Sequence, residues 1–126
     1  MTNLPKFLDI GIGGFLGNSY SVRLIEDGSL EYWASESEYT NQKRQFVTPD
    51  PNRWDNFRNS LDQIGIWKWL NNYPNIEGIM DGTHWHAEII YDDKHIKTQG
   101  NNNYPKEDFI NFMRAVSELL GGKIFE

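Results

Sequence analysis

The sequence contains no cysteine, which excludes disulfide bonds, thiolate metal ligands and cysteine nucleophiles. It also lacks long apolar runs. Near its start, Asp9 interrupts the apolar segment that follows Lys6, well short of the roughly 7–15 apolar residues of a secretion signal. No segment approaches the roughly 20 apolar residues that cross a bilayer. We therefore expect a chain without a secretion signal or a membrane span, located in the cytoplasm.

Positive charge is scarce. Lysine and arginine number 12 against 18 acidic residues, which gives a formal net charge of −6 and an isoelectric point near 5.0. Proteins that bind nucleic acid gain affinity by neutralising phosphates with lysine and arginine. We therefore expect no nucleic-acid partner. An acidic domain is suited instead to a basic protein, such as a toxin, because opposite charge steers the encounter.

Large apolar side chains are plentiful. Aromatic residues make up 14% of the 126 residues and include five tryptophans, which is too much apolar surface for a disordered segment. A chain of this length forms one domain as a rule. We expect a single globular domain over residues 1–126.

Two segments have the apolar spacing of amphipathic helices. The first spans 50–64, with Asp50 as the N-cap and Gly65 at its end. The second spans 105–120, with Pro105 as its first residue and a glycine pair after its end. The apolar faces are Trp54, Phe57, Leu61 and Ile64 in the first helix, and Phe109, Phe112, Met113, Val116, Leu119 and Leu120 in the second.

The remaining segments read as strands with period-two alternation, at 7–13, 20–25, 30–35, 45–48, 83–91 and 95–98. Asp27-Gly28 and the turn at 92–94 close two hairpins. The polar segments 35–44 and 101–103 are predicted to be exposed loops. Strands grouped in hairpins predict an α+β fold: an antiparallel or mixed sheet of about five to six strands with both helices on one face.

The alternation of the strand at 83–91 predicts which side chains lie under the helices and which lie on the open face of the sheet. Trp85, Ala87 and Ile89 are expected in the core, and His84, His86 and Glu88 on the open face.

His84 and His86 form the best candidate metal site in the sequence. Side chains two apart on a strand point the same way, so both imidazoles could bind Zn²⁺ or Fe²⁺, with His95, Glu88 or Asp81 as a further ligand. A carboxylate in line on the same strand is a poor tetrahedral partner. The simpler interpretation is a row of polar side chains on the solvated side of a half-buried strand.

Other catalytic motifs are absent from the sequence. The glycine-rich segment 11–17 lacks the third glycine of the dinucleotide motif and is followed by a strand pattern, so we interpret it as a turn or bulge. No serine lies in a Gly-x-Ser-x-Gly elbow. The sequence therefore favours a protein that is not an enzyme.

The tryptophans suggest an aromatic binding surface. Trp54 and Trp85 are assigned to the core by their positions in the helix and strand patterns. This leaves Trp33, Trp67 and Trp69 as candidates for binding a small ligand, a glycan or a protein partner, with Glu88 as a polar neighbour on the open face. Trp67 and Trp69 would point the same way if their segment were extended.

From the hairpin at Asp27-Gly28 onward, and mainly from Trp54, the chain resembles a family of small bacterial α+β proteins of unknown function. The resemblance is carried by Trp54 and Phe57, Ile66-Trp67-Lys68-Trp69, Tyr73, Asp81-Gly82-Thr83, Trp85, Ile89, Tyr91 and the segment 100–105 before Phe109. It implies a single α+β domain, and it implies no established activity and no catalytic residue.

Taken together, these features favour a non-enzymatic binding or protein-interaction module that uses the open sheet face and the loops. The alternatives are a small metal-binding protein or metal-dependent enzyme centred on His84 and His86, and a small-ligand or glycan binder that uses exposed tryptophans. The favoured interpretation requires no cofactor.

Overall fold

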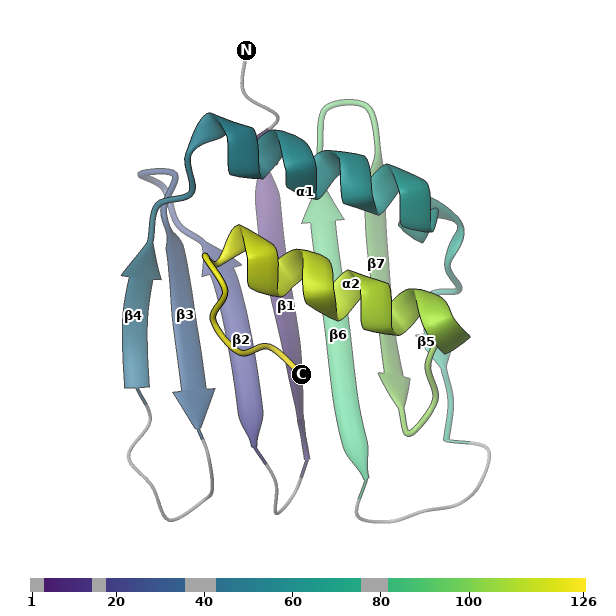
Figure 1. Ribbon diagram of the computed structural model, residues 1–126. Coiled ribbons are helices and arrows are strands. Elements are labelled where there is room, and N and C mark those ends of the chain that lie inside the picture. The colour runs from purple at the N-terminus through teal and green to yellow at the C-terminus, as the bar shows by residue number, and fades with distance from the viewer. Residues whose placement is uncertain (1–3, 15–17, 36–42, 76–81) are drawn as a thin grey trace.

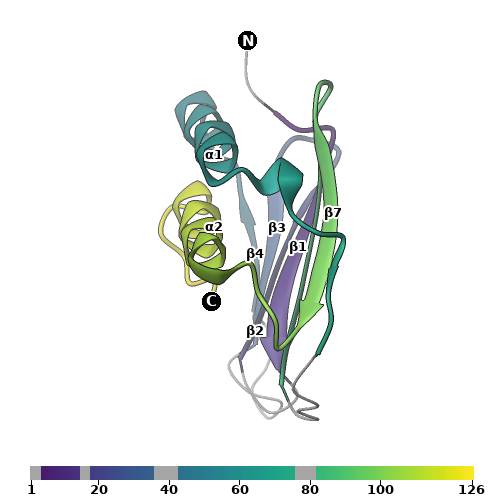
Figure 2. The same cartoon turned by 90° about the vertical axis from the view of Figure 1, so that its right-hand side faces the viewer.

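The computed structural model describes residues 4–14, 18–35, 43–75 and 82–126. A seven-stranded sheet in the order β4-β3-β2-β1-β6-β7-β5 carries two helices side by side across one face (Figure 1). The elements are β1 (Phe7–Gly14), β2 (Ser19–Leu24), β3 (Leu30–Ser35), β4 (Lys43–Val47), α1 (Pro51–Ile64), the 3₁₀ turn η1 (Ile66–Lys68), β5 (Asn72–Tyr73), β6 (Thr83–Ile90), β7 (His95–Asn101) and α2 (Lys106–Leu119). Figure 2 shows that both helices lie on the same side of the sheet.

The predicted α+β class is confirmed, while the strand count differs from the expected five to six. The additional strand is β5, which has two residues and pairs parallel to β7, whereas all other neighbours are antiparallel. Two residues are too few to produce an alternation that a sequence pattern can reveal. None of the helices that the structure describes is long and apolar enough to span a membrane.

Helix α1 begins and ends where its capping residues predict. The Asp50 carboxylate accepts a hydrogen bond from the backbone N–H of Arg53 at 2.8 Å, and Pro51 is the first helical residue. At the other end, Gly65 has a left-handed backbone (φ 73°), and its N–H donates to the carbonyls of Leu61 and Asp62.

Helix α2 begins one residue later than predicted. Pro105 lies in a tight turn before the helix, in which the N–H of Lys106 donates to the carbonyl of Tyr104 at 2.7 Å. Lys106 itself has a positive φ of 43°, which is unusual for a residue with a side chain. Gly121 and Gly122 follow the helix with positive φ, as their position in the sequence predicts.

The core lies between the sheet and the helices. Trp54 and Trp85 are both buried there, as predicted. The Trp85 ring contacts Phe109 at a centroid distance of 4.9 Å. Its indole N–H donates to the carbonyl of Asn103 at 2.9 Å. This one side chain therefore joins the central strand β6 to α2 and to the loop before it.

The segment 101–103, expected to be an exposed loop, is largely integrated into the fold. Asn101 is the last residue of β7, and Asn102 and Asn103 are half-buried. Asn102 accepts from Thr83 N–H at 2.8 Å through its side chain and donates to Thr83 through its backbone at 2.9 Å. Asparagine side chains can replace missing ladder partners, which composition alone does not reveal. Of the expected loop at 35–44, Ser35 lies in β3, Lys43 and Arg44 lie in β4, and residues 36–42 fall outside the described residues.

The glycines near the start lie in a strand rather than in the expected turn or bulge. Gly11, Gly13 and Gly14 belong to β1, while Gly17 lies outside the described residues. A Cβ atom on Gly11 would approach the His86 ring to 2.5 Å. The glycine therefore makes room for an imidazole that lies across β1.

Candidate functional site

The face of the sheet opposite the helices is covered by none of the helices that the structure describes (Figure 2). We call it the open face. Strand alternation brings polar and aromatic side chains to it from six strands. Its principal side chains are Phe7, Asp9, Arg23, Glu31, Trp33, Arg44, Phe46, His84, His86, Glu88, His95, Lys97 and Gln99.

Five of these residues form a compact group on β2, β3 and β4, which we call the Glu31 cluster: Arg23, Glu31, Trp33, Arg44 and Phe46. The Glu31 side chain is only 7% exposed although it lies on the open face. Its carboxylate accepts a hydrogen bond from Trp33 Nε1 at 2.5 Å. Nη2 atoms of Arg23 and Arg44 each lie 3.5 Å from Glu31 Oε2. The neighbouring side chains therefore enclose the carboxylate.

The cluster fixes the charge state of Glu31. The hydrogen bond from the Trp33 indole lowers the pKa of the Glu31 carboxyl, and the positive charges of Arg44 and Arg23 act in the same direction against the effect of burial. Glu31 is therefore ionised at neutral pH.

Arg44 is held by aromatic rings as well as by Glu31. Its guanidinium lies 5.5 Å from the centre of the Trp33 ring and 5.0 Å from the centre of the Phe46 ring. Phe46 itself is 55% exposed. The cluster thus presents an oriented arginine and a large exposed aromatic ring, and these are the residue types that dominate protein-binding surfaces.

His84 and His86 lie on the open face, as the alternation predicts. His84 Nδ1 forms a hydrogen bond with Asn101 Oδ1, and His86 Nε2 lies 3.2 Å from Asp9 Oδ1. His95 is opposite Ile90, at the turn end of the hairpin, so the structure does not bring it to the other two imidazoles. Within residues 4–14, 18–35, 43–75 and 82–126, no group of three His, Asp or Glu side chains is placed to hold a metal ion.

Glu88 and Asp81 were the other candidate ligands. Glu88 lies on the open face, with a carboxylate oxygen 3.9 Å from Lys97 Nζ. Asp81 lies outside the described residues.

The three candidate tryptophans occupy different environments. Trp33 belongs to the Glu31 cluster and is half-buried. Trp69 is buried in the core, where its ring lies 5.5 Å from that of Phe112. Trp67 is half-buried and packs edge-on against Tyr91. The turn η1 replaces the extended segment on which Trp67 and Trp69 would point the same way, so they do not form a joint platform.

A second polar cluster, which the sequence does not reveal, joins α1 to the hairpin turn after β6. Arg58 donates to both carboxylate oxygens of Asp93, at 3.1 and 2.8 Å, and to Asp62 at 3.1 Å. Its guanidinium lies 4.6 Å from the centre of the Tyr91 ring. The hydrogen bond from Arg58 lowers the pKa of Asp93, while burial raises the pKa of Tyr91. We interpret this cluster as structural because it ties together distant parts of the chain.

Replacing Arg58 with alanine is expected to lower the free energy of unfolding by about 2 kcal/mol, since it removes charge-assisted hydrogen bonds from a mostly buried guanidinium. The matched control is Arg53→Ala on the exposed side of the same helix, for which we expect a change within about 0.5 kcal/mol. Urea unfolding of both variants measures the difference. Equal losses would contradict a structural role for the Arg58 cluster.

Comparison of the chain with protein-family models and with curated proteins gives no match. The resemblance to a family of small bacterial proteins therefore stays a prediction.

Proposed function

We propose that the protein is a non-enzymatic interaction module that binds a protein partner through the open face, centred on the Glu31 cluster. The observation that supports this most is an enclosed carboxylate on a sheet face that no described helix covers. The Glu31 carboxylate accepts the Trp33 indole N–H and lies 3.5 Å from the guanidinium groups of Arg23 and Arg44. Side chains fixed before binding lose less conformational entropy when a partner docks.

The chemistry of the cluster suits a partner surface that combines apolar groups with hydrogen-bond acceptors. The exposed ring of Phe46 provides apolar contact area, and Arg44 beside it provides donors in a fixed plane. Arginine and large aromatic side chains at the centre of an interface contribute more binding free energy than other residue types.

The charges of the open face do not favour a basic partner. Its described side chains include three acidic residues, Asp9, Glu31 and Glu88, and three basic residues, Arg23, Arg44 and Lys97. The excess of acidic over basic residues in the chain is therefore not carried by these open-face side chains. We propose recognition by shape, aromatic contact and hydrogen bonding rather than by net charge.

The experiment places a photoreactive amino acid at Phe46 and, in a separate protein, at Ile110. Ile110 is the matched control because it is also a large exposed apolar residue, 62% exposed against 55% for Phe46, but lies on α2. After irradiation in an extract of the source cells, we expect a specific protein adduct at position 46 and none at position 110. Adducts at 110 alone, or at neither position, would reject the proposal.

A further inference from the structure

The outer edge of β7 is only partly paired. β7 pairs with β6 along its whole length, from His95 to Asn101, but β5 pairs with it only at Gln99 and Gly100. Figure 2 looks onto this edge and shows that the chain after η1 reaches β7 only along its lower part. Among the described residues, the segment 95–98 therefore has a strand neighbour on one side alone.

The hydrogen bonds at the two ends of the hairpin show which backbone groups of β7 point outward. Tyr91 N–H donates to Lys94 C=O at 2.7 Å, and Asn102 N–H donates to Thr83 C=O at 2.9 Å. In an antiparallel ladder, alternate residues on a strand face its partner, so the N–H and C=O groups of His95, Lys97 and Gln99 face away from β6. The N–H of Gln99 confirms this, because it donates outward to Asn71 C=O at 3.2 Å.

The backbone N–H of Gln99 therefore has an outward partner, and the other two outward-facing residues, His95 and Lys97, differ from it. Within the described part of the chain, no hydrogen-bond acceptor is found for the backbone N–H groups of His95 and Lys97. Exposed edge groups of this kind are a template for an additional strand.

A groove of about 950 Å³ lies along this edge. Trp67 and Trp69 line it on the helix side of the sheet. Its open-face wall is polar and consists of Asp9, His86, Glu88, His95, Lys97 and Gln99. The two walls differ in chemistry, one aromatic and the other polar. An extended segment in the groove would place alternate side chains against each wall.

We infer that the outer edge of β7 binds an extended segment of a partner protein as an added β-strand, with apolar and acidic side chains in alternation. The backbone of the segment pairs with the outward groups of His95 and Lys97, continuing the line that β5 begins. Its apolar side chains contact Trp67 and the neighbouring helix side of the groove.

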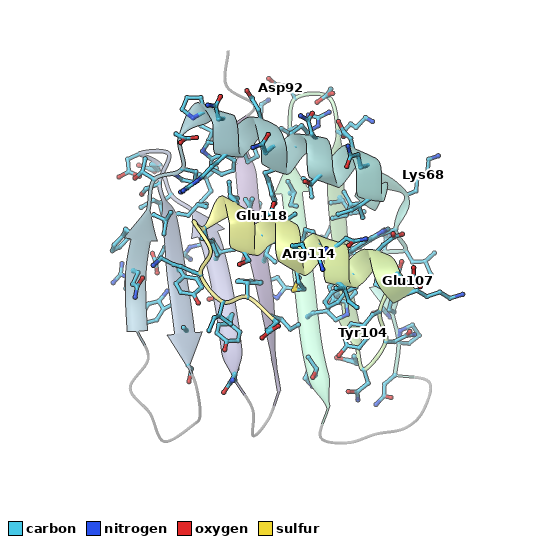
Figure 3. The ribbon with its side chains drawn as sticks, in the orientation of Figure 1. Lys68, Asp92, Tyr104, Glu107, Arg114 and Glu118 are labelled. Carbon is cyan, nitrogen blue, oxygen red and sulfur yellow. The ribbon has the colours of Figure 1, made fainter. Side chains whose placement is uncertain are left out.

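The preference for acidic side chains follows from the charges at this edge. Lys97 is 85% exposed and lies on the outermost of three adjacent strands, while Glu88 on β6, 3.9 Å from its Nζ, and Asp9 on β1 lie one and two strands further in. Lys94, at the start of the edge, is exposed. Lys68 on η1 is exposed too, and its side chain extends outward beyond the helices (Figure 3). Directly opposite charges on adjacent strands stabilise their pairing, so an acidic residue beside Lys97 continues the Glu88–Lys97 pair by one strand.

This inference concerns a different surface from the Glu31 cluster and does not depend on it. The probe is a short peptide of alternating glutamate and valine, blocked at both ends, added to the isotope-labelled full chain. Backbone amide resonances of His95 and Lys97 are expected to shift and to gain protection from hydrogen exchange. A peptide of alternating lysine and valine should bind at least about tenfold more weakly.

Lys97→Pro tests the backbone pairing. It removes an N–H that points away from β6, so the β6–β7 ladder keeps its hydrogen bonds, and proline is accepted on edge strands. We expect affinity for the glutamate–valine peptide to fall about tenfold, as for the loss of one hydrogen bond. Lys97→Glu keeps the N–H and reverses the charge; it should weaken binding as well, and it provides the test if the proline variant does not fold.

Arg44→Ala, in the Glu31 cluster, should leave the affinity for this peptide unchanged, so this inference and the proposed function fail separately. The inference is overturned if the peptide shifts only resonances of Lys43–Val47, the other edge of the sheet. It is also overturned if the labelled chain pairs with a second copy of itself at β7 and excludes the peptide, or if both Lys97 variants bind as the unaltered protein does.

Discussion

Replacing Trp85 with alanine is expected to lower the free energy of unfolding by about 3–5 kcal/mol. The side chain is buried at the centre of the core and contacts Trp69, Tyr73 and Phe109. Its removal leaves a cavity between β6 and α2 and also leaves the carbonyl of Asn103 without its indole donor. The loss is a large part of the roughly 5–15 kcal/mol that stabilises a domain.

The matched control is Trp33→Ala, which makes the same chemical change on the open face, where the indole is half-buried. Urea unfolding should show a clearly smaller loss for this variant, because the Trp33 site is next to solvent and can rehydrate. Equal losses for Trp33→Ala and Trp85→Ala would mean that the open face is as tightly packed as the core, contrary to the fold described above.

Glu31 is expected to stabilise the folded protein in a pH-dependent way. Its pKa is lowered in the folded protein, so the stabilisation is complete above the unfolded-state pKa of about 4.3 and is lost as the pH falls through the folded-state value. Glu31→Gln should therefore be less stable than the unaltered protein at neutral pH, with a difference that shrinks as the solution becomes acidic.

Urea unfolding across a pH series measures this dependence. The unaltered protein should bind up to about one more proton on acid unfolding than the Glu31→Gln variant. The control is Glu118→Gln, an exposed carboxylate on the outer side of α2 (Figure 3). If Glu31→Gln and the unaltered protein showed parallel pH profiles, Glu31 would not be held by Trp33 and the two arginines.

Features that depend on neighbouring residues were predictable from the sequence. Asp50 and Gly65 mark the two ends of α1, because capping depends only on residues within one turn of the helix end. The two faces of β6 were predictable because strand alternation is a property of the strand itself. The alternation assigned His84 and Trp85 to their observed sides of the sheet.

Features that depend on strand register and chain path were not predictable. The Glu31 cluster requires Arg23, Glu31 and Arg44 to meet across three strands, and their register follows from the whole sheet. Trp69 enters the core because η1 turns the chain before it, and no local pattern distinguishes it from Trp67. Among the described residues, the edge of β7 is only partly paired because β5 has two residues.

The most direct test of a binding role for the open face is photocrosslinking at position 46, performed in the unaltered background and in the Glu31→Gln background. We expect a specific adduct that weakens in the second background, because Arg44 and Trp33 lose the carboxylate that they contact. An adduct of equal yield in both backgrounds, or one that forms equally at position 110 on α2, would contradict it.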